Sequence, residues 1–446
     1  MKKKILLVFS MLLLVTIIAP VLAAPKVTLP TVSTWDADMI NSKGTGYTGE
    51  GVYVAVLDTG LAPNWKDYFP VERIATNLGK GFKEAVLWDQ KTEKFVETGR
   101  LLETTWIGST GATHGTHVTS TIIGYNYYAI NDALAGLPLP PVFVEGIAPK
   151  ATIIPIKVLS DYHIGKSHLS DDYDAQHLVF GTDRAVAAGI NYATDLAIAG
   201  YKPMIITMSL GGPTKAQIIE TAINNAMANG VIVVASAGNE GTKGMGWPGA
   251  YPQVISVGAS GWKYEWYWPN HIAPTVSPLS RNRLWWLQSS HYLFNEIPET
   301  ELLAEEVYIT DWSSRELAGQ ELDVVAPGSW VRGPYPGAPG YAHLPWWSNG
   351  LGGLAGLNPG NFYYVGGTSM SAPHVTGVVA QMLQKDDRLT QTQVESILKS
   401  TALPIPAGSM PVFDLSPTMG FYTYTWGDDA TGSGLVQANA ALSAIT

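Results

Sequence analysis

Cysteine is absent from this sequence, and charged side chains are few. Of its 446 residues, 14% are Asp, Glu, Lys or Arg, against about 25% in typical soluble domains. Without cysteine there is no disulfide, so stability must come from packing, with bound ions as a candidate addition. The low charge content suits a large buried core and excludes a disordered binding protein. The net charge of −10 argues against nucleic acid as a partner, since phosphate binding needs clustered Lys and Arg.

Long apolar runs are also missing, apart from one at the N-terminus. Residues 5–18 are apolar except Ser10 and Thr16, which is short of the roughly 20 residues that span a membrane. Three lysines precede this run and Val21-Leu22-Ala23 follows it, as in a secretory signal that is cleaved off. We therefore expect a signal peptide at residues 1–23, a secreted protein and no stable membrane span after cleavage. The alternative is an uncleaved N-terminal anchor.

What the sequence does contain is a series of short apolar runs separated by helical patterns. The runs cover residues 52–57, 152–158, 204–208, 231–235 and 254–257. Such runs are typical of parallel strands buried on both faces. Residues 215–229 have apolar side chains at helical spacing, and Gly230 is a typical helix end. The alternation predicts an α/β fold with a doubly wound parallel sheet, in one domain because no linker or repeat interrupts it.

Four short motifs carry candidate chemistry. They are Asp58-Thr59-Gly60 at the end of the first predicted strand, His114-Gly115-Thr116-His117-Val118, Ala237-Gly238-Asn239-Glu240-Gly241 and Gly367-Thr368-Ser369-Met370-Ser371-Ala372-Pro373-His374. A serine hydroxyl is a poor nucleophile at neutral pH and needs a base, and a third group that orients the base. In this order the motifs resemble those of the subtilisin-like serine proteases, the subtilases, from about Trp35 to the C-terminus. The resemblance implies a subtilisin-like three-layer α/β/α fold and hydrolysis of peptide bonds.

The resemblance implies a role for one residue of each motif. Ser369 would be the nucleophile, His114 its general base and Asp58 the group that orients the base. Asn239 would stabilise the oxyanion together with the Ser369 backbone N–H. His117 and Ser371 are expected to be structural. This chemistry requires no cofactor, and because a histidine titrates at about pH 6.5, activity should fall in acid.

The candidate nucleophile is expected at the N-terminal end of a helix. We predict this helix from about Met370 to Gln384, with Ser369 before it and Pro373 in its first turn. A helix N-terminus offers free N–H groups and the positive end of the helix dipole to a developing oxyanion. His374, inside the helix, is expected to pack in the core.

The resemblance also implies where a polypeptide substrate binds. Ser209-Leu210-Gly211-Gly212 resembles the strand edge that pairs with an extended substrate, and Trp247-Pro248-Gly249-Ala250 resembles the pocket for the residue before the scissile bond. No acidic residue occurs in the second segment, so we expect broad specificity with an apolar or aromatic preference. A protease specific for basic residues is the alternative, supported by the acidic run Asp171, Asp172 and Asp174.

Two acidic features are candidates for structural calcium, which takes carboxylate and carbonyl oxygens. Asp67 lies at the place where many subtilases have a calcium ligand. The acidic run Asp171, Asp172 and Asp174 is the second candidate. It lacks the glycine spacing of a helix–loop–helix calcium loop, so a solvated surface is the alternative there.

The chain departs from compact subtilases in three insertions, near residues 76–110, 261–309 and 334–360. In the second, Trp262, Tyr264, Trp266 and Trp268 alternate, which predicts an aromatic face on one side of a strand. That face either packs on the body of the protein or contacts a substrate or a surface partner.

Only residues 24–34 separate the predicted signal from the catalytic domain at 35–446, whereas subtilases usually carry an inhibitory pro-domain there. A separate inhibitor or chaperone acting in trans is therefore a candidate partner. The competing function is a catalytically inactive or occluded subtilase-fold surface protein that binds peptides or an envelope partner. Fold alone does not separate the two.

Overall fold

The computed structural model describes residues 29, 31–109, 113–127, 142–163, 177–263, 302–336, 346–348, 362–414 and 420–446. Parallel strands form its centre where the sequence predicts them: β2 (Tyr53–Asp58), β7 (Thr152–Lys157), β10 (Met204–Met208), β11 (Ile232–Ser236) and β12 (Ile255–Trp262). β14 (Val324–Pro327) lies parallel beside β12. These strands are mostly apolar along their whole length because both faces of the sheet are covered.

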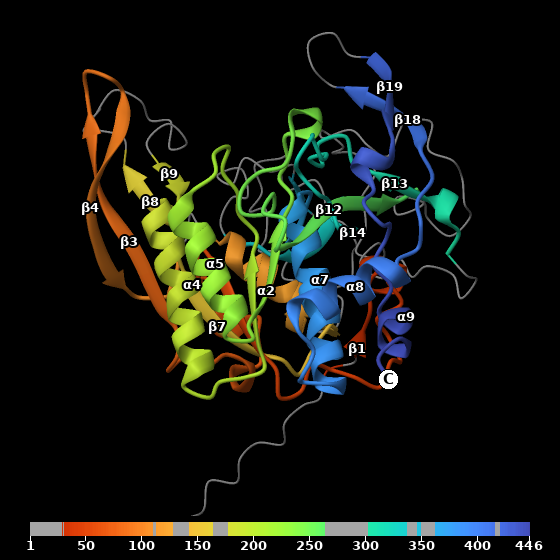
Figure 1. Cartoon of the computed structure of the whole chain (residues 1–446), viewed down its shortest axis with the longest axis horizontal. Helices are drawn as coiled ribbons and strands as arrows, with labels where there is room; N and C mark the ends of the chain where they lie inside the picture. The colour runs from red at the N-terminus through yellow and green to blue at the C-terminus, as the bar shows by residue number, and fades with distance from the viewer. Residues whose placement is uncertain are drawn as a thin grey trace, which may run out of the picture.

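Helices cover the two faces of this sheet (Figure 1). Two pack on one face and two on the other: α2 (His114–Ile123) with α7 (Thr368–Lys385), and α4 (Asp183–Ile198) with α5 (Gln217–Ala228). Successive side chains of a strand point to opposite faces. Val54 and Val56 of β2 accordingly join the core under α2 and α7, whereas Ala55 and Leu57 join the core under α4 and α5. The predicted three-layer α/β/α fold is confirmed.

The sheet is mixed rather than purely parallel, because its edges carry antiparallel strands. One edge is a hairpin of β3 (Lys80–Asp89) and β4 (Lys94–Thr104), which the insertion near 76–110 forms. The other is β13 (Val307–Ile309), antiparallel to β12. The strand order is β13-β12-β11-β10-β2-β7-β3-β4, and the hairpin reaches beyond the body of the protein at the left of Figure 1. Most β4 side chains are exposed, so no apolar run in the sequence predicts this strand.

Smaller elements complete the fold. Two three-stranded sheets contain β1 (Thr31–Val32), β5 (Tyr125–Tyr127) and β6 (Val142–Val144), and β15 (Val331–Pro334), β16 (Trp346–Ser348) and β17 (Phe362–Val365). Two hairpins contain β8 (Ser160–His163) and β9 (His177–Phe180), and β18 (Gly408–Asp414) and β19 (Gly420–Trp426). Further α-helices are α1 (Trp35–Met39), α8 (Gln391–Thr401) and α9 (Ala438–Ser443). Short 3-10 helices are η1 (Trp65–Asp67), η2 (Val71–Arg73), η3 (Gly241–Lys243), η5 (Ala304–Glu306) and η7 (Asp428–Ala430).

Several predictions fall on residues outside the described ranges. These are the signal peptide at 1–23, the acidic run at 171–174 and most of the insertions near 261–309 and 334–360. Of the four alternating aromatic residues, Trp262 is buried at the end of β12, and the other three lie outside the described ranges. Among the residues that are described, no helix combines the length and the apolar character needed to cross a membrane.

The topology brings the four motifs to one edge of the sheet. β2, β10 and β11 are parallel neighbours, so their carboxyl ends lie at the same edge, where sites form in such sheets. α2 and α7 pack against each other. Both begin at this edge, since the first residue of α2 contacts the end of β2 and the first turn of α7 contacts the residue after β10.

Candidate active site

Asp58 and His114 form a buried hydrogen-bonded pair. Asp58 ends β2 and His114 opens α2, and the His114 Nδ1 lies 2.8 Å from Asp58 Oδ2 and 2.9 Å from Oδ1. Thr59 supports both partners: its backbone N–H donates to Asp58 Oδ1 at 2.6 Å, and its hydroxyl accepts the Gly115 N–H at 2.9 Å. When Nδ1–H donates to the carboxylate, Nε2 of the neutral ring is left free to accept a proton.

Gly115 allows α2 to approach the end of β2 this closely, and Gly60 allows the turn that follows β2. A side chain at position 115 would bring its Cβ to 2.6 Å from the Gly60 carbonyl oxygen and 3.1 Å from Asp58 Oδ1. Gly60 has φ of 76°, and a Cβ there would collide with the Trp106 carbonyl oxygen. A larger residue at position 115 would therefore push α2 and His114 away from Asp58, and one at position 60 would disturb the turn after β2 through its collision with Trp106.

Ser369 lies within the first turn of α7, so the predicted start of this helix is wrong by two residues. α7 begins at Thr368, which places Pro373 in the helix interior rather than in its first turn. The Ser369 hydroxyl donates to the Ser209 carbonyl oxygen at 3.3 Å, and the Ser209 hydroxyl donates to the Ser369 carbonyl oxygen at 2.8 Å. The structure thus pairs His114 with Asp58, and it gives the Ser369 hydroxyl a partner other than His114.

Asn239 explains the early start of α7, because it caps the helix from a distant part of the chain. Its Oδ1 accepts the Thr368 backbone N–H at 2.9 Å and the Thr368 hydroxyl at 3.1 Å. The amide nitrogen of Asn239, with its two N–H donors, therefore points away from Thr368. The Asn239 backbone N–H donates to the Glu240 carboxylate at 2.8 Å, and this carboxylate also accepts the Ser314 hydroxyl at 3.1 Å. The sequence carries no signal for the contribution of Ser314.

His117 and Ser371, which the sequence predicts to be structural, are buried in the protein. The His117 Nε2–H donates to the Val331 carbonyl oxygen at 3.0 Å. Burial, followed by the charge of nearby His114, lowers the pKa of His117 to about 3, so this ring is neutral at neutral pH. Ser371 is fully buried, and its hydroxyl packs so closely on Gly328 that a Cβ there would collide with it.

The two predicted substrate segments are neighbours in the structure. Residues 209–212 leave β10, and the Gly212 N–H and carbonyl oxygen both pair with the Trp247 backbone, at 2.8 and 2.9 Å. Within the described residues, the Gly211 backbone groups make no hydrogen bond. Trp247 packs against Tyr251 with ring centroids 4.6 Å apart, and the Lys215 ammonium lies 5.7 Å from the Trp247 ring. In this segment the Gly211 backbone groups are therefore open to an added strand, whereas those of Gly212 are already paired.

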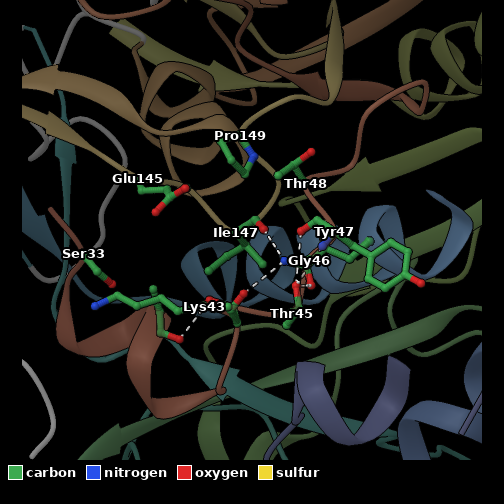
Figure 2. A pocket seen from close by; sticks show the side chains of 14 residues that line it. Ser33, Lys43, Thr45, Gly46, Tyr47, Thr48, Glu145, Ile147 and Pro149 are labelled. Atoms are coloured by element: carbon green, nitrogen blue, oxygen red, sulfur yellow. Dashed lines mark hydrogen bonds between the residues drawn. The ribbon is translucent and has the colours of Figure 1, made fainter. Parts of the chain in front are cut away.

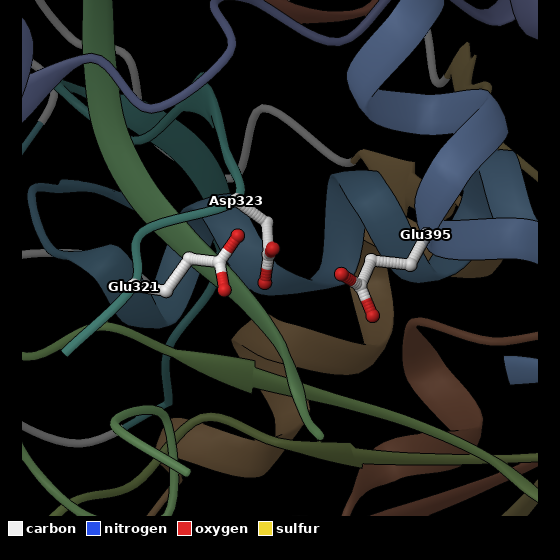
Figure 3. Close-up of side chains that lie close together, drawn as sticks. All are labelled: Glu321, Asp323 and Glu395. Atoms are coloured by element: carbon white, nitrogen blue, oxygen red, sulfur yellow. The ribbon is translucent and has the colours of Figure 1, made fainter. Parts of the chain in front are cut away.

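The described residues contain one group of three acidic side chains close enough to share a cation, and it does not include Asp67. Its members are Glu321, Asp323 and Glu395 (Figure 3). The Lys399 ammonium pairs with Glu321, lies 3.1 Å from Asp323 and lies 3.6 Å from Glu395, so a protein cation already balances these carboxylates. Asp67 is exposed in η1 and accepts a hydrogen bond from Asn64 at 3.2 Å. Calcium at Asp67 stays a prediction.

A cavity of about 160 Å³ lies toward the other end of α7 (Figure 2). Gln381 lines it, about three helical turns along α7 from Ser369. The Gln381 amide joins the two loops around the cavity, since it donates to the Ile147 carbonyl oxygen at 2.6 Å and accepts the Thr45 hydroxyl at 3.0 Å. This cavity is separate from the candidate active site.

Comparison with solved structures agrees with the fold. Sphericase is 23% identical, and the match covers 90% of this chain and 97% of that one, with a TM-score of 0.52. The S41 Psychrophilic Protease is 21% identical, and the match covers 92% and 99% of the two chains, also with a TM-score of 0.52. At this level of identity, both define the class of fold and no more.

The sequence comparison is more specific. The model of the Subtilase family, Peptidase_S8, matches residues 49–434, so the chain belongs to the subtilase family, as its motifs predict. Subtilisin E of Bacillus subtilis (strain 168) is 27% identical over 361 residues, which are 80% of this chain but only 62% of that protein. Subtilisin BL of Lederbergia lenta is 26% identical over 396 residues, or 89% of this chain and 92% of that protein.

Proposed function

We propose that this protein is a serine endopeptidase that cleaves peptide bonds through an acyl-enzyme intermediate. Ser369, His114 and Asp58 form its triad, and Asn239 its oxyanion donor. Membership of the subtilase family supports hydrolysis of peptide bonds. The observation that carries the proposal is the buried pair of His114 Nδ1 and Asp58, at 2.8 Å, next to the helix whose first turn holds Ser369. That pairing sets the tautomer in which Nε2 is a base.

The chemistry begins when the Ser369 hydroxyl turns from the Ser209 carbonyl oxygen toward His114. His114 Nε2 takes the hydroxyl proton as the Ser369 oxygen bonds to the substrate carbonyl carbon, and Asp58 stabilises the imidazolium. The oxyanion accepts hydrogen bonds from the Asn239 amide and from the Ser369 N–H, which the start of α7 leaves without a helical partner. His114 then returns the proton to the leaving amine, and water hydrolyses the acyl-enzyme by the same steps.

We infer broad specificity with a preference for apolar or aromatic residues before the scissile bond. The Gly211 backbone supplies unused hydrogen-bonding groups for an extended peptide. Trp247 supplies an aromatic surface beside them, and the Lys215 ammonium near its ring disfavours a basic substrate side chain. We also infer that residues 1–23 direct secretion and that the protein is active outside the cell, where polypeptide substrates are met.

The test is labelling by a fluorophosphonate probe at neutral pH, since this probe reacts with a serine that has a base and an oxyanion hole. We expect the protein to be labelled and Ser369→Ala to be unlabelled. Ser371→Ala is the matched control, because this serine lies two positions away on the same helix, and it should label like the unmutated protein.

Failure of the folded protein to react would reject the endopeptidase proposal. The alternative would then be an inactive or occluded protein with the subtilase fold. The low exposure of Ser369, 6%, and its bond to Ser209 would explain why it does not react. Labelling that persists in Ser369→Ala would instead place the nucleophile elsewhere.

A further inference from the structure

Pro373 leaves one carbonyl of α7 without its helical partner, and that carbonyl belongs to Ser369. In an α-helix, the carbonyl oxygen of each residue accepts the N–H of the residue four positions later. Proline has no N–H, so an interior proline removes one such bond. Four positions before Pro373 is Ser369, the candidate nucleophile. An unpaired carbonyl at this buried position would cost free energy and would let the first turn move.

Ser209 supplies the missing donor. Its hydroxyl lies 2.8 Å from the Ser369 carbonyl oxygen, and both residues are buried. Ser209 follows directly after β10, so this bond ties the first turn of α7 to the strand end where an extended substrate would pair. The Ser209 carbonyl oxygen in turn holds the Ser369 hydroxyl at 3.3 Å. One residue therefore contacts the nucleophile through both its side chain and its backbone.

We propose that the Ser209 hydroxyl is a positioning residue for the nucleophile, which takes the place of the N–H that Pro373 lacks. It fixes the position of the Ser369 backbone relative to Asn239 and to the segment after β10 where an extended substrate would pair. This inference rests on the proposed endopeptidase function, and it gives Ser209 a side-chain task in addition to any backbone pairing with substrate. Because this bond holds the nucleophile and not the substrate, its loss should lower kcat rather than raise KM.

The experiment is a double-mutant cycle of Ser209→Ala and Pro373→Ala, read as kcat and KM on a peptide substrate. Ser209→Ala should lower kcat about tenfold, because a buried acceptor loses its donor, with KM unchanged within about twofold. In the double variant, the new N–H at position 373 can donate to the Ser369 carbonyl oxygen. It should therefore recover most of the lost kcat, and Ser209→Thr, which keeps a hydroxyl, should retain it.

Ser236→Ala is the control for a buried serine at a strand end, since its hydroxyl bonds to the Leu210 carbonyl oxygen at 3.4 Å and not to the nucleophile. It should leave kcat within about twofold. The inference is wrong if Ser209→Ala keeps full kcat, or if the effects of the two substitutions simply add.

The same cycle measured as unfolding free energy in the Ser369→Ala background separates this inference from the proposed function. If the two substitutions are coupled in unfolding free energy but the unmutated protein does not react with the fluorophosphonate probe, the endopeptidase proposal is rejected. Only the contact between Ser209 and the Ser369 carbonyl is then confirmed. Absence of coupling in both measurements, in a reactive enzyme, would reject the positioning role alone.

Discussion

At the scale of single residues, the candidate oxyanion donor is held by motif residues to which the sequence alone assigns no role. Thr368 is the main one: its hydroxyl donates to Asn239 Oδ1 and accepts the Gly238 N–H, both at 3.1 Å. Thr368→Val keeps the shape of the side chain but removes both contacts. We expect kcat to fall about fivefold to tenfold with little change in KM, because the amide loses orientation in the transition state. Peptide hydrolysis measures this.

Thr376→Val is the matched control for that substitution. Its hydroxyl also lies on α7, but it bonds to Thr207 and to a helix carbonyl, each at 2.9 Å. A loss of kcat as large as in Thr368→Val would show that any buried threonine of α7 matters equally, and would contradict a specific role for Thr368.

His117 makes stability depend on pH. Burial lowers the pKa of His117 to about 3 in the folded protein, against about 6.5 in an unfolded chain. Between these values the unfolded state binds the proton and the folded state does not, so the unfolding free energy falls as the pH drops from about 6.5 to 3. His117→Gln, which keeps a donor for the Val331 carbonyl oxygen, should reduce that slope by up to about 1.4 kcal/mol per pH unit.

Denaturant unfolding at several pH values measures this slope. An unchanged slope in His117→Gln would mean that other groups carry the acid sensitivity. Asp36 adds acid sensitivity only at the acid end of that pH range and below it: burial alone would raise its pKa, but the hydrogen bond and charge of His374 lower it below its usual value. Its contribution to stability is therefore lost only at a lower pH, as the pH falls through that lowered pKa.

At the scale of elements, a buried carboxylate joins the two strands of the β3–β4 hairpin. Glu84 is fully buried, and its Oε1 accepts the Gly99 N–H at 2.7 Å. Gly99 has φ of 75° and lies in a β-bulge of β4, where the strand register shifts opposite Ala85. Glu84→Ala removes this acceptor and should lower the free energy of opening the hairpin by about 1–3 kcal/mol. Hydrogen exchange of residues 94–104 measures the effect, and unchanged protection there would contradict it.

At the scale of the whole molecule, Lys399 of α8 joins distant parts of the chain around one charge. It pairs with Glu321 and with the buried Asp323, whose carboxylate also accepts the N–H of Ser256 in β12 at 2.8 Å. Lys399→Met leaves these carboxylates unbalanced and should lower the unfolding free energy by about 2 kcal/mol. Lys150→Met, which breaks an exposed pair with Glu50, should cost less than about 1 kcal/mol. Equal losses in thermal unfolding would contradict the difference.

The central strands could be predicted from the sequence because a strand that is buried on both faces is a continuous run of apolar residues. The run at 52–57 became β2 at Tyr53–Asp58, and the run at 204–208 became β10 with the same bounds. The edge hairpin could not be predicted in this way, since exposed strands carry polar side chains. The start of α7 was predicted two residues late, because its cap comes from Asn239, which is far away in sequence.

The class of the fold, the family and the order of the four motifs follow from the amino-acid sequence, because strand burial and short motifs are local properties of the chain. How those motifs contact one another depends on the three-dimensional packing. Only the packing of α2 on β2 brings His114 to Asp58, and only the contact of β10 with α7 lets Ser209 reach the carbonyl that Pro373 leaves unpaired. Such contacts depend on the path of the chain in space, which no local pattern of residues records.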